Sequence, residues 1–183
     1  MSRTRSSFLA GCRDLLPLVP AGIAFGLVVG VAIAQAGLGA VESVGMSGLV
    51  YGASAQLAAT VLWRDGAPLF VVVATVLVIN ARFFIYGASL APVLGPSRWW
   101  HGLVYGYFLR DGIYAATMTR AVPDPAIDPL PYFLGGALVD WGVWIVATVA
   151  GTLGASLLPA SWSLDFIVPL VFIALLAGAA TTR

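Results

Sequence analysis

A few charged and amide side chains lie inside long apolar stretches of this sequence, and these are the residues that could do chemistry. They are Gln56, Asn80, Arg82, Arg110, Asp111 and Asp140. Inside hydrocarbon an Arg or Asp near a helix centre costs about 2.5–3.5 kcal/mol even on a lenient insertion scale, so each needs a partner or water. The set offers cations for a carboxylate, anions for an ammonium group and amides for hydrogen bonds.

Arg110 and Asp111 are adjacent, and adjacent residues on a helix point in different directions, so we expect each to reach a different partner. Asp140 is the expected partner of Arg110. Two interpretations stay open: a purely structural buried ion pair, or a polar cavity for a charged or zwitterionic substrate. Arg82 is equally open, because its long side chain could also reach the membrane interface and do nothing else. Gln56 suits a hydrogen bond between helices.

Other chemistries are poorly supported. The one histidine, His101, lies at a predicted membrane boundary and no Gly-x-Ser-x-Gly elbow occurs, so we expect no enzyme. With Cys12 as the one cysteine, no zinc or haem site and no cofactor is expected, and the carboxylate spacing does not support a metal site. A net charge of +1, with every basic residue an Arg, excludes a nucleic-acid surface.

These polar residues must be positioned by membrane helices. The chain has 183 residues, of which 60% are apolar and 9% charged, against about 25% charged in a typical soluble domain. At about 20 apolar residues per span, this length has room for six or seven transmembrane helices. A large soluble domain is therefore excluded, and with it any function that needs one.

The sequence predicts an all-α, multi-pass helix bundle in the cell membrane, forming a single transmembrane domain over residues 1–183. The six predicted spans are residues 15–36, 44–63, 68–87, 102–119, 132–157 and 166–181. A signal peptide is the alternative for the first span. However, that span is longer than a signal-peptide core and is interrupted by Pro17 and Pro20, which favours a retained helix.

Arginine positions predict that the N-terminus is cytoplasmic. Six crossings then place Arg3, Arg5, Arg13, Arg64, Arg120 and Arg183 inside. Arg98 would be the one loop arginine outside. This bias agrees with the positive-inside rule and supports the number and order of the spans.

Small residues predict where helices approach closely. Gly22, Gly26, Gly30 and Ala34 recur at intervals of four in the first span, so another helix can pack against that face. Packing within one bundle is favoured here over dimerisation. On a continuous fourth helix, Gly102, Gly106, Arg110 and Tyr114 would also share one face.

One short motif occurs twice, as Tyr51-Gly52-Ala53-Ser54 and as Tyr86-Gly87-Ala88-Ser89. Glycine and small polar residues within apolar spans are typical of broken helices, and paired interruptions can mark a transporter binding site. A chance match of common residues is the alternative.

Longer motifs are also distributed along the chain. The most specific joins Asn80-Ala81-Arg82 to Tyr86-Gly87-Ala88-Ser89-Leu90-Ala91-Pro92, and the second runs from Tyr51 to Gln56. Others are Pro20 to Leu27, Glu42-Ser43, Met46-Ser47, Asp111 and Tyr114-Ala115. Together they resemble the AzlC-type branched-chain amino acid permeases, from about Gly11 to the last span.

Members of that family are multi-pass membrane proteins associated with efflux of branched-chain amino acids, typically with a small hydrophobic AzlD-type partner subunit. The resemblance implies an amino acid exporter component. Members often carry an Asp-Glu pair where this chain has Asp111-Gly112, which puts a proton-coupling role there in doubt. Members also usually continue with further hydrophobic segments, so the chain is expected to be a short divergent member or C-terminally truncated relative to the family.

The leading hypothesis is a secondary transporter that exports Leu, Ile, Val or an analogue. Arg82 or Arg110 would bind the carboxylate, and Asp111 or Asp140 would bind the ammonium group. Protonation of either Asp is a candidate coupling step. Aromatic residues would contact the apolar side chain, namely Phe25, Tyr51 and Tyr114. The alternatives are a non-transporting membrane scaffold or assembly subunit, and a passive channel, although no ring-forming charge motif supports a channel.

Overall fold

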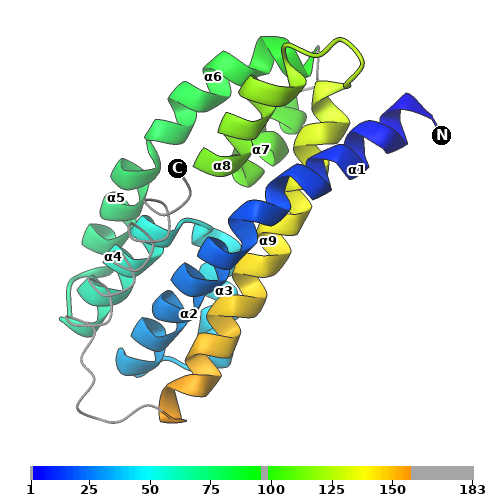
Figure 1. Cartoon of the computed structure of the whole chain (residues 1–183). Coiled ribbons are helices and arrows are strands. Elements are labelled where there is room, and N and C mark those ends of the chain that lie inside the picture. The colour runs from blue at the N-terminus through cyan, green and yellow to red at the C-terminus, as the bar shows by residue number, and fades with distance from the viewer. Residues whose placement is uncertain (1, 96–98, 158–183) are drawn as a thin grey trace, which may run out of the picture. The chain divides into compact units, whose positions relative to one another are not determined.

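The computed structural model describes residues 2–95 and 99–157 (Figure 1). The regular secondary structure of these residues is entirely helical, which confirms the all-α prediction. The α-helices are α1 (Arg3–Leu15), α2 (Val19–Gln35), α3 (Ala40–Val50), α4 (Ala53–Arg64), α5 (Leu69–Asn80), α6 (Arg82–Leu94), α7 (Trp99–Phe108), α8 (Asp111–Ala116) and α9 (Pro129–Gly154). The predicted sixth span, residues 166–181, lies outside the described residues, as do Arg98 and Arg183.

Two helical runs are long and apolar enough to cross a membrane by length and composition. The first runs from Arg3 to Gln35 through a 3-10 turn at Leu16–Leu18 that contains Pro17, so helix begins well before the predicted residue 15. The second is α9, which continues through a 3-10 turn to Leu157. A third is reached if α5 and α6, which meet at a 41° bend, form one span. The count of six spans stays a prediction.

Two predicted spans are each divided into shorter helices. Between α3 and α4, Tyr51 has the left-handed backbone conformation (φ 35°) and Gly52 is extended. The first copy of the repeated motif therefore does interrupt a helix. The second copy, Tyr86 to Ser89, lies within α6 and does not, because the nearby break falls at Ala81 instead.

The predicted fourth span is also interrupted. α7 ends at Phe108, Arg110 is extended (φ −138°, ψ 164°), and α8 restarts at Asp111 before a π-helical turn at Thr117–Ala121. The prediction that Arg110 shares one helix face with Gly102 and Gly106 is therefore wrong, because no single helix contains all three.

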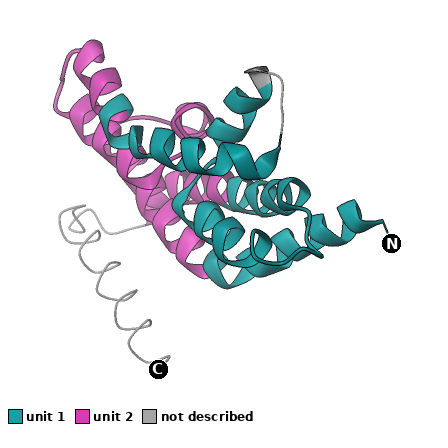
Figure 2. Cartoon of the chain, turned by 90° about the horizontal axis from the view of Figure 1, so that it is seen from above, with its two compact units in different colours: residues 1–19, 77–143 teal, residues 20–76, 144–183 magenta. Residues whose placement is uncertain are grey.

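The described residues form two compact units (Figure 2). Unit 1 contains residues 2–19, 77–95 and 99–143, and unit 2 contains residues 20–76 and 144–157. The division falls inside α9, so that helix contributes its first part to unit 1 and its second part to unit 2.

In unit 1, α1 packs closely against the first part of α9 (Figure 1). A Cβ added to Gly11 would collide with the carbonyl of Tyr132, and one added to Gly135 would collide with the carbonyl of Phe8. A buried apolar cluster joins α1, α6, α8 and α9, and consists of Leu15, Leu90, Leu109, Ile113, Phe133 and Ala137. This cluster fixes the elements that carry the charged residues.

In unit 2, α2 packs equally closely against the second part of α9. A Cβ added to Gly26 would lie 2.6 Å from the Cβ of Ala147, and one added to Gly30 would collide with the carbonyl of Thr148. The predicted small-residue face of the first span is thus confirmed at these two positions. At Gly102 and Gly106, no atom of the described residues lies within 4 Å of an added Cβ.

Candidate functional site

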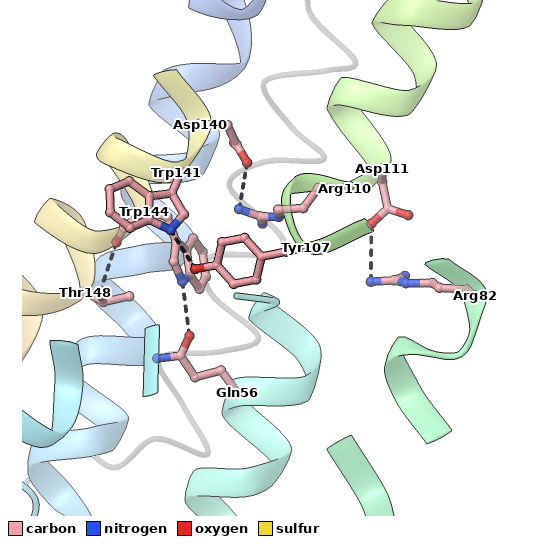
Figure 3. A network of polar contacts seen from close by, with 9 residues as sticks. All are labelled: Gln56, Arg82, Tyr107, Arg110, Asp111, Asp140, Trp141, Trp144 and Thr148. Atoms are coloured by element: carbon pink, nitrogen blue, oxygen red, sulfur yellow. Dashed lines mark hydrogen bonds and ion pairs between the residues drawn. The ribbon is translucent and has the colours of Figure 1, made fainter. Parts of the chain in front are cut away.

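The four ionisable residues predicted inside the membrane all lie in unit 1, where they form two ion pairs. Nη1 of Arg110 lies 2.9 Å from Oδ2 of Asp140, and Nη2 of Arg82 lies 3.2 Å from Oδ2 of Asp111 (Figure 3). The predicted Arg110–Asp140 contact is confirmed. So is the prediction that the adjacent Arg110 and Asp111 reach different partners.

The helix breaks explain why these side chains meet. Arg82 is the first residue of α6 after the bend at Ala81, and Asp111 is the first residue of α8. Arg110 lies between α7 and α8 in an extended conformation, and Figure 3 shows its side chain directed toward Asp140 on α9, away from that of Asp111. One helix break therefore supplies a charge to each pair.

The two pairs differ in exposure. The side chains of Arg110 and Asp140 are 18% and 23% exposed, whereas those of Arg82 and Asp111 are 42% and 53% exposed. A water-exposed ion pair contributes about 0–1 kcal/mol. Breaking a well-buried pair by removing one partner costs about 3–5 kcal/mol, because a charge is left buried. The Arg82–Asp111 pair is therefore the one that a ligand could open at small cost.

Aromatic rings adjoin the more exposed pair. The rings of Tyr86 and Tyr114 are stacked, with centroids 4.4 Å apart and planes 9° apart. The Tyr86 hydroxyl donates a hydrogen bond to Asp111, and the Ser89 hydroxyl donates one to the Tyr114 hydroxyl at 2.9 Å. The guanidinium of Arg82 also lies 5.0 Å from the ring centroid of Phe83. Asp111 is thus held by a tyrosine as well as by an arginine.

Sequence reasoning did not assign Tyr86 or Ser89 to the site. Both belong to the second copy of the repeated motif, which was considered only as a possible helix break. The available signal was their spacing from Arg82, because residues three or four apart on a helix lie on one face. Tyr86 is four residues from Arg82, and Ser89 is three from Tyr86.

Asn80 and Gln56 are placed differently from the charged residues. Asn80 is half-buried at the end of α5, two residues before Arg82 and next to the bend at Ala81. Gln56 lies in unit 2 and is 0% exposed. Of the aromatic residues predicted to line an apolar pocket, Tyr114 lies in unit 1, whereas Phe25 and Tyr51 lie in unit 2.

The Gln56 side chain belongs to a buried network of neutral groups within unit 2 (Figure 3). Its amide nitrogen donates to Oγ of Ser47 at 2.9 Å, and its amide oxygen accepts from Nε1 of Trp144 at 3.1 Å. The hydroxyls of Ser47 and Thr148 lie 2.7 Å apart. Both ends of the amide therefore have partners, as expected for a hydrogen bond between helices.

A second hydroxyl contact extends this neutral set, because Oγ1 of Thr152 donates to Oγ of Ser43 at 3.0 Å. The serines and threonines of both contacts were missed from the sequence. The signal was present: Ser43 and Ser47, like Thr148 and Thr152, are four residues apart and so share a helix face. Within residues 2–95 and 99–157, no group of three or more His, Cys, Asp or Glu side chains could hold a metal ion.

An all-helical, apolar protein with ion pairs at its helix breaks has the features of a membrane protein with a polar centre. The family model described as AzlC protein matches residues 17–158. The chain therefore belongs to the AzlC family, and the family predicted from its motifs is confirmed.

A relative supports the membrane location. The chain is 25% identical over 177 residues to the inner membrane protein YgaZ of Escherichia coli (strain K12), and the match covers 93% of this chain and 72% of the relative. No solved structure matches. Family membership, the relative and the apolar helices together indicate a membrane protein of the transporter type.

Proposed function

We propose that this protein is a transporter component that exports small zwitterionic amino acids, with Leu, Ile and Val as the first substrates to test. The observation that carries the proposal is the presence of two Arg–Asp ion pairs at helix breaks within apolar segments of unit 1. An α-amino acid has one carboxylate and one ammonium group, so a site with paired opposite charges suits both ends. The choice of branched-chain substrates and of export rests on the family resemblance.

The remaining predicted residues enter the proposal in supporting roles. Asn80, beside the bend that precedes Arg82, would add an amide to the polar centre. Gln56 would act through the neutral network of unit 2, where it links three helices. The proposed assembly also includes membrane lipid and a small hydrophobic AzlD-type subunit. The proposal involves transport rather than catalysis.

Contacts within unit 1 support the predicted membrane topology. A side-chain nitrogen of Arg3 donates to the carbonyl of Pro125 at 2.6 Å, and the hydroxyl of Ser7 accepts from the backbone N–H of Asp128 at 2.8 Å. The start of α1 and the segment before α9 therefore lie on the same side of a membrane crossed by the run of α1 and α2. The number of crossings between them is then even, as in the proposed order of six spans with four before α9.

The proposal is tested by measuring export of labelled leucine from loaded vesicles, with and without an AzlD-type subunit. We expect saturable export selective for the L-isomer, and at least a ten-fold loss in Asp111→Asn. The matched control is Asp65→Asn, because Asp65 also lies 3.2 Å from an arginine, Arg64, with side chains 40% and 59% exposed. Equal export by Asp111→Asn and the control would remove Asp111 from the mechanism.

The same assay separates the alternatives. A passive channel would give flux without saturation or stereoselectivity. A scaffold or assembly subunit would keep its function when Arg110 and Asp140 are replaced together by an apolar pair of similar size. A dependence on the pH gradient that vanished only in Asp140→Asn would identify that carboxylate as the coupling site.

A further inference from the structure

We propose that the Arg82–Asp111 ion pair is exchangeable, so that a zwitterionic amino acid binds by replacing it. The substrate carboxylate would take the place of Asp111 beside Arg82, and the substrate ammonium group would take the place of Arg82 beside Asp111. This inference rests on the proposed function and assigns its ligand contacts. It also separates the two ion pairs, giving Arg110–Asp140 the role of a fixed contact between the α7–α8 break and α9.

Accessibility distinguishes the two pairs. About half of each side chain in the Arg82–Asp111 pair is exposed, compared with about a fifth in the Arg110–Asp140 pair. Ionisable side chains of membrane spans that are not buried in protein face water-filled cavities rather than lipid. A polar ligand arriving through water would therefore meet Arg82 and Asp111 first.

Charge balance defines the ligand. A molecule with both a carboxylate and an ammonium group gives each ion of the opened pair a new partner of opposite charge. A molecule with only one of these groups would leave Arg82 or Asp111 without its counter-ion in a site of limited hydration, which is unfavourable. The exchange therefore selects zwitterions over simple amines and simple carboxylates.

Tyr86 gives the exchange a fixed point. Its hydroxyl donates to Asp111, so the carboxylate keeps one protein partner when Arg82 turns to the ligand. The stacked ring of Tyr114, whose hydroxyl accepts from Ser89, restricts how Tyr86 can move. We assign Tyr86 and Tyr114 as positioning residues for Asp111, with their ring surfaces beside the site for the apolar side chain of the ligand.

Competition against labelled L-leucine tests this inference with the full chain in liposomes. The competitors are L-leucine, 4-methylpentanoate, which lacks the ammonium group, and 3-methylbutylamine, which lacks the carboxylate. For the wild type we expect L-leucine to compete at least ten-fold better than either analogue. In Asp111→Asn the preference for L-leucine over 4-methylpentanoate should fall at least ten-fold, because Arg82 no longer has a competing anion.

The complementary variant should change the other preference. In Arg82→Gln, 3-methylbutylamine should gain on L-leucine, whereas Arg82→Lys, which keeps the charge, should retain the preference for zwitterions. Tyr86→Phe keeps the stacked ring and removes the hydroxyl, and we expect leucine binding to weaken a few-fold. Asp65→Asn should behave as the wild type, and size-exclusion profiles should show that each variant is folded.

Failure of this inference differs from failure of the proposed function. Leucine export with unchanged competitor preferences in both Asp111→Asn and Arg82→Gln would overturn the exchange and leave the transport proposal standing. If the wild type neither binds nor exports any branched-chain amino acid, the proposed function itself is wrong. If Asp111→Asn does not fold, Arg82→Gln and Arg82→Lys decide between the two outcomes through the amine competitor.

Discussion

Unit 1 and unit 2 both pack glycines of the first helical run against α9, yet they differ in the polar groups that they contain. Unit 1 carries two Arg–Asp ion pairs, one of them about half exposed. The polar network of unit 2 consists of hydroxyl, amide and indole groups that are buried and hydrogen-bonded to one another. Charge with exposure indicates ligand contact, whereas neutral and buried groups indicate helix attachment.

The difference follows from what each kind of group costs inside a membrane protein. Neutral hydroxyls and amides can be fully satisfied by neighbouring helices, and in transmembrane bundles such bonds contribute about 0.6 kcal/mol on average. Charges are far more expensive and are retained where they pair or meet water. The ion pairs of unit 1 therefore need a functional explanation more than the network of unit 2 does.

The largest expected effect tests what the units share. Gly30→Val would place a side chain 2.7 Å from the backbone nitrogen of Thr152 and 2.9 Å from the Cα of Gly151, so α9 would have to move. Overpacking of a core usually costs about 1–3 kcal/mol, and a contact with backbone is at the high end or beyond. We expect loss of folded protein, measured by thermal unfolding in detergent and by yield.

Gly135→Val is the matched change in unit 1, because its side chain would meet the backbone of Phe8 and Cys12. Gly102→Ala is the control, since an added Cβ there meets no atom of the described residues within 4 Å. If Gly135→Val were tolerated and Gly30→Val were not, the close packing against α9 would not be a shared feature of the two units.

The next effect concerns the less exposed ion pair. Arg110→Gln or Asp140→Asn alone should reduce the free energy of unfolding by about 3 kcal/mol, because each leaves a charge without its partner. The double variant should recover much of this loss, since neither charge remains. Equilibrium unfolding of the single and double variants measures the coupling. Fully additive losses would show that the Arg110–Asp140 contact at 2.9 Å is not an energetic unit.

Much of this arrangement was predictable from long apolar runs and from the cost of charge within them. The fifth span was predicted at residues 132–157, and helix α9 begins three residues earlier, at Pro129, with its 3-10 turn ending at Leu157. The Arg110–Asp140 pair was predictable because both charges had to lie deep in the membrane and needed opposite partners. The break at Tyr51-Gly52 was signalled by the glycine.

The rest could not be derived because no local signal distinguishes it. Leu109 and Arg110 contain no helix-breaking residue, so the break between α7 and α8 is imposed by tertiary contacts such as those of the buried Leu109. The Arg82–Asp111 contact depends on that break and on the bend at Ala81. The hydroxyl contacts of unit 2 were missed because Ser and Thr in apolar helices commonly bond their own backbone, as Thr148 also does.

A smaller effect is expected in the neutral network. Ser47→Ala removes the hydroxyl that accepts from Gln56 and contacts Thr148, and leaving such buried groups unsatisfied costs about 1–3 kcal/mol. The preference for leucine over its single-charge analogues should not change, because no charge of unit 1 is altered. Ser156→Ala, an exposed serine of unit 2, is the control. A changed preference in Ser47→Ala would contradict the division of roles between the units.

The smallest effect compares two indole groups on α9. Trp144 donates to the buried amide of Gln56 in unit 2, whereas Trp141 donates to the hydroxyl of Tyr107 in unit 1 at 2.8 Å. Because Tyr107 is 37% exposed, water can replace its hydroxyl, and Tyr107→Phe should cost no more than about 0.5–1 kcal/mol in the free energy of unfolding. Chemical denaturation beside Ser47→Ala measures the difference. A loss in Tyr107→Phe equal to that in Ser47→Ala would show that unit 1 also depends on neutral hydrogen bonds for its stability, and the contrast between the units would then rest on charge alone.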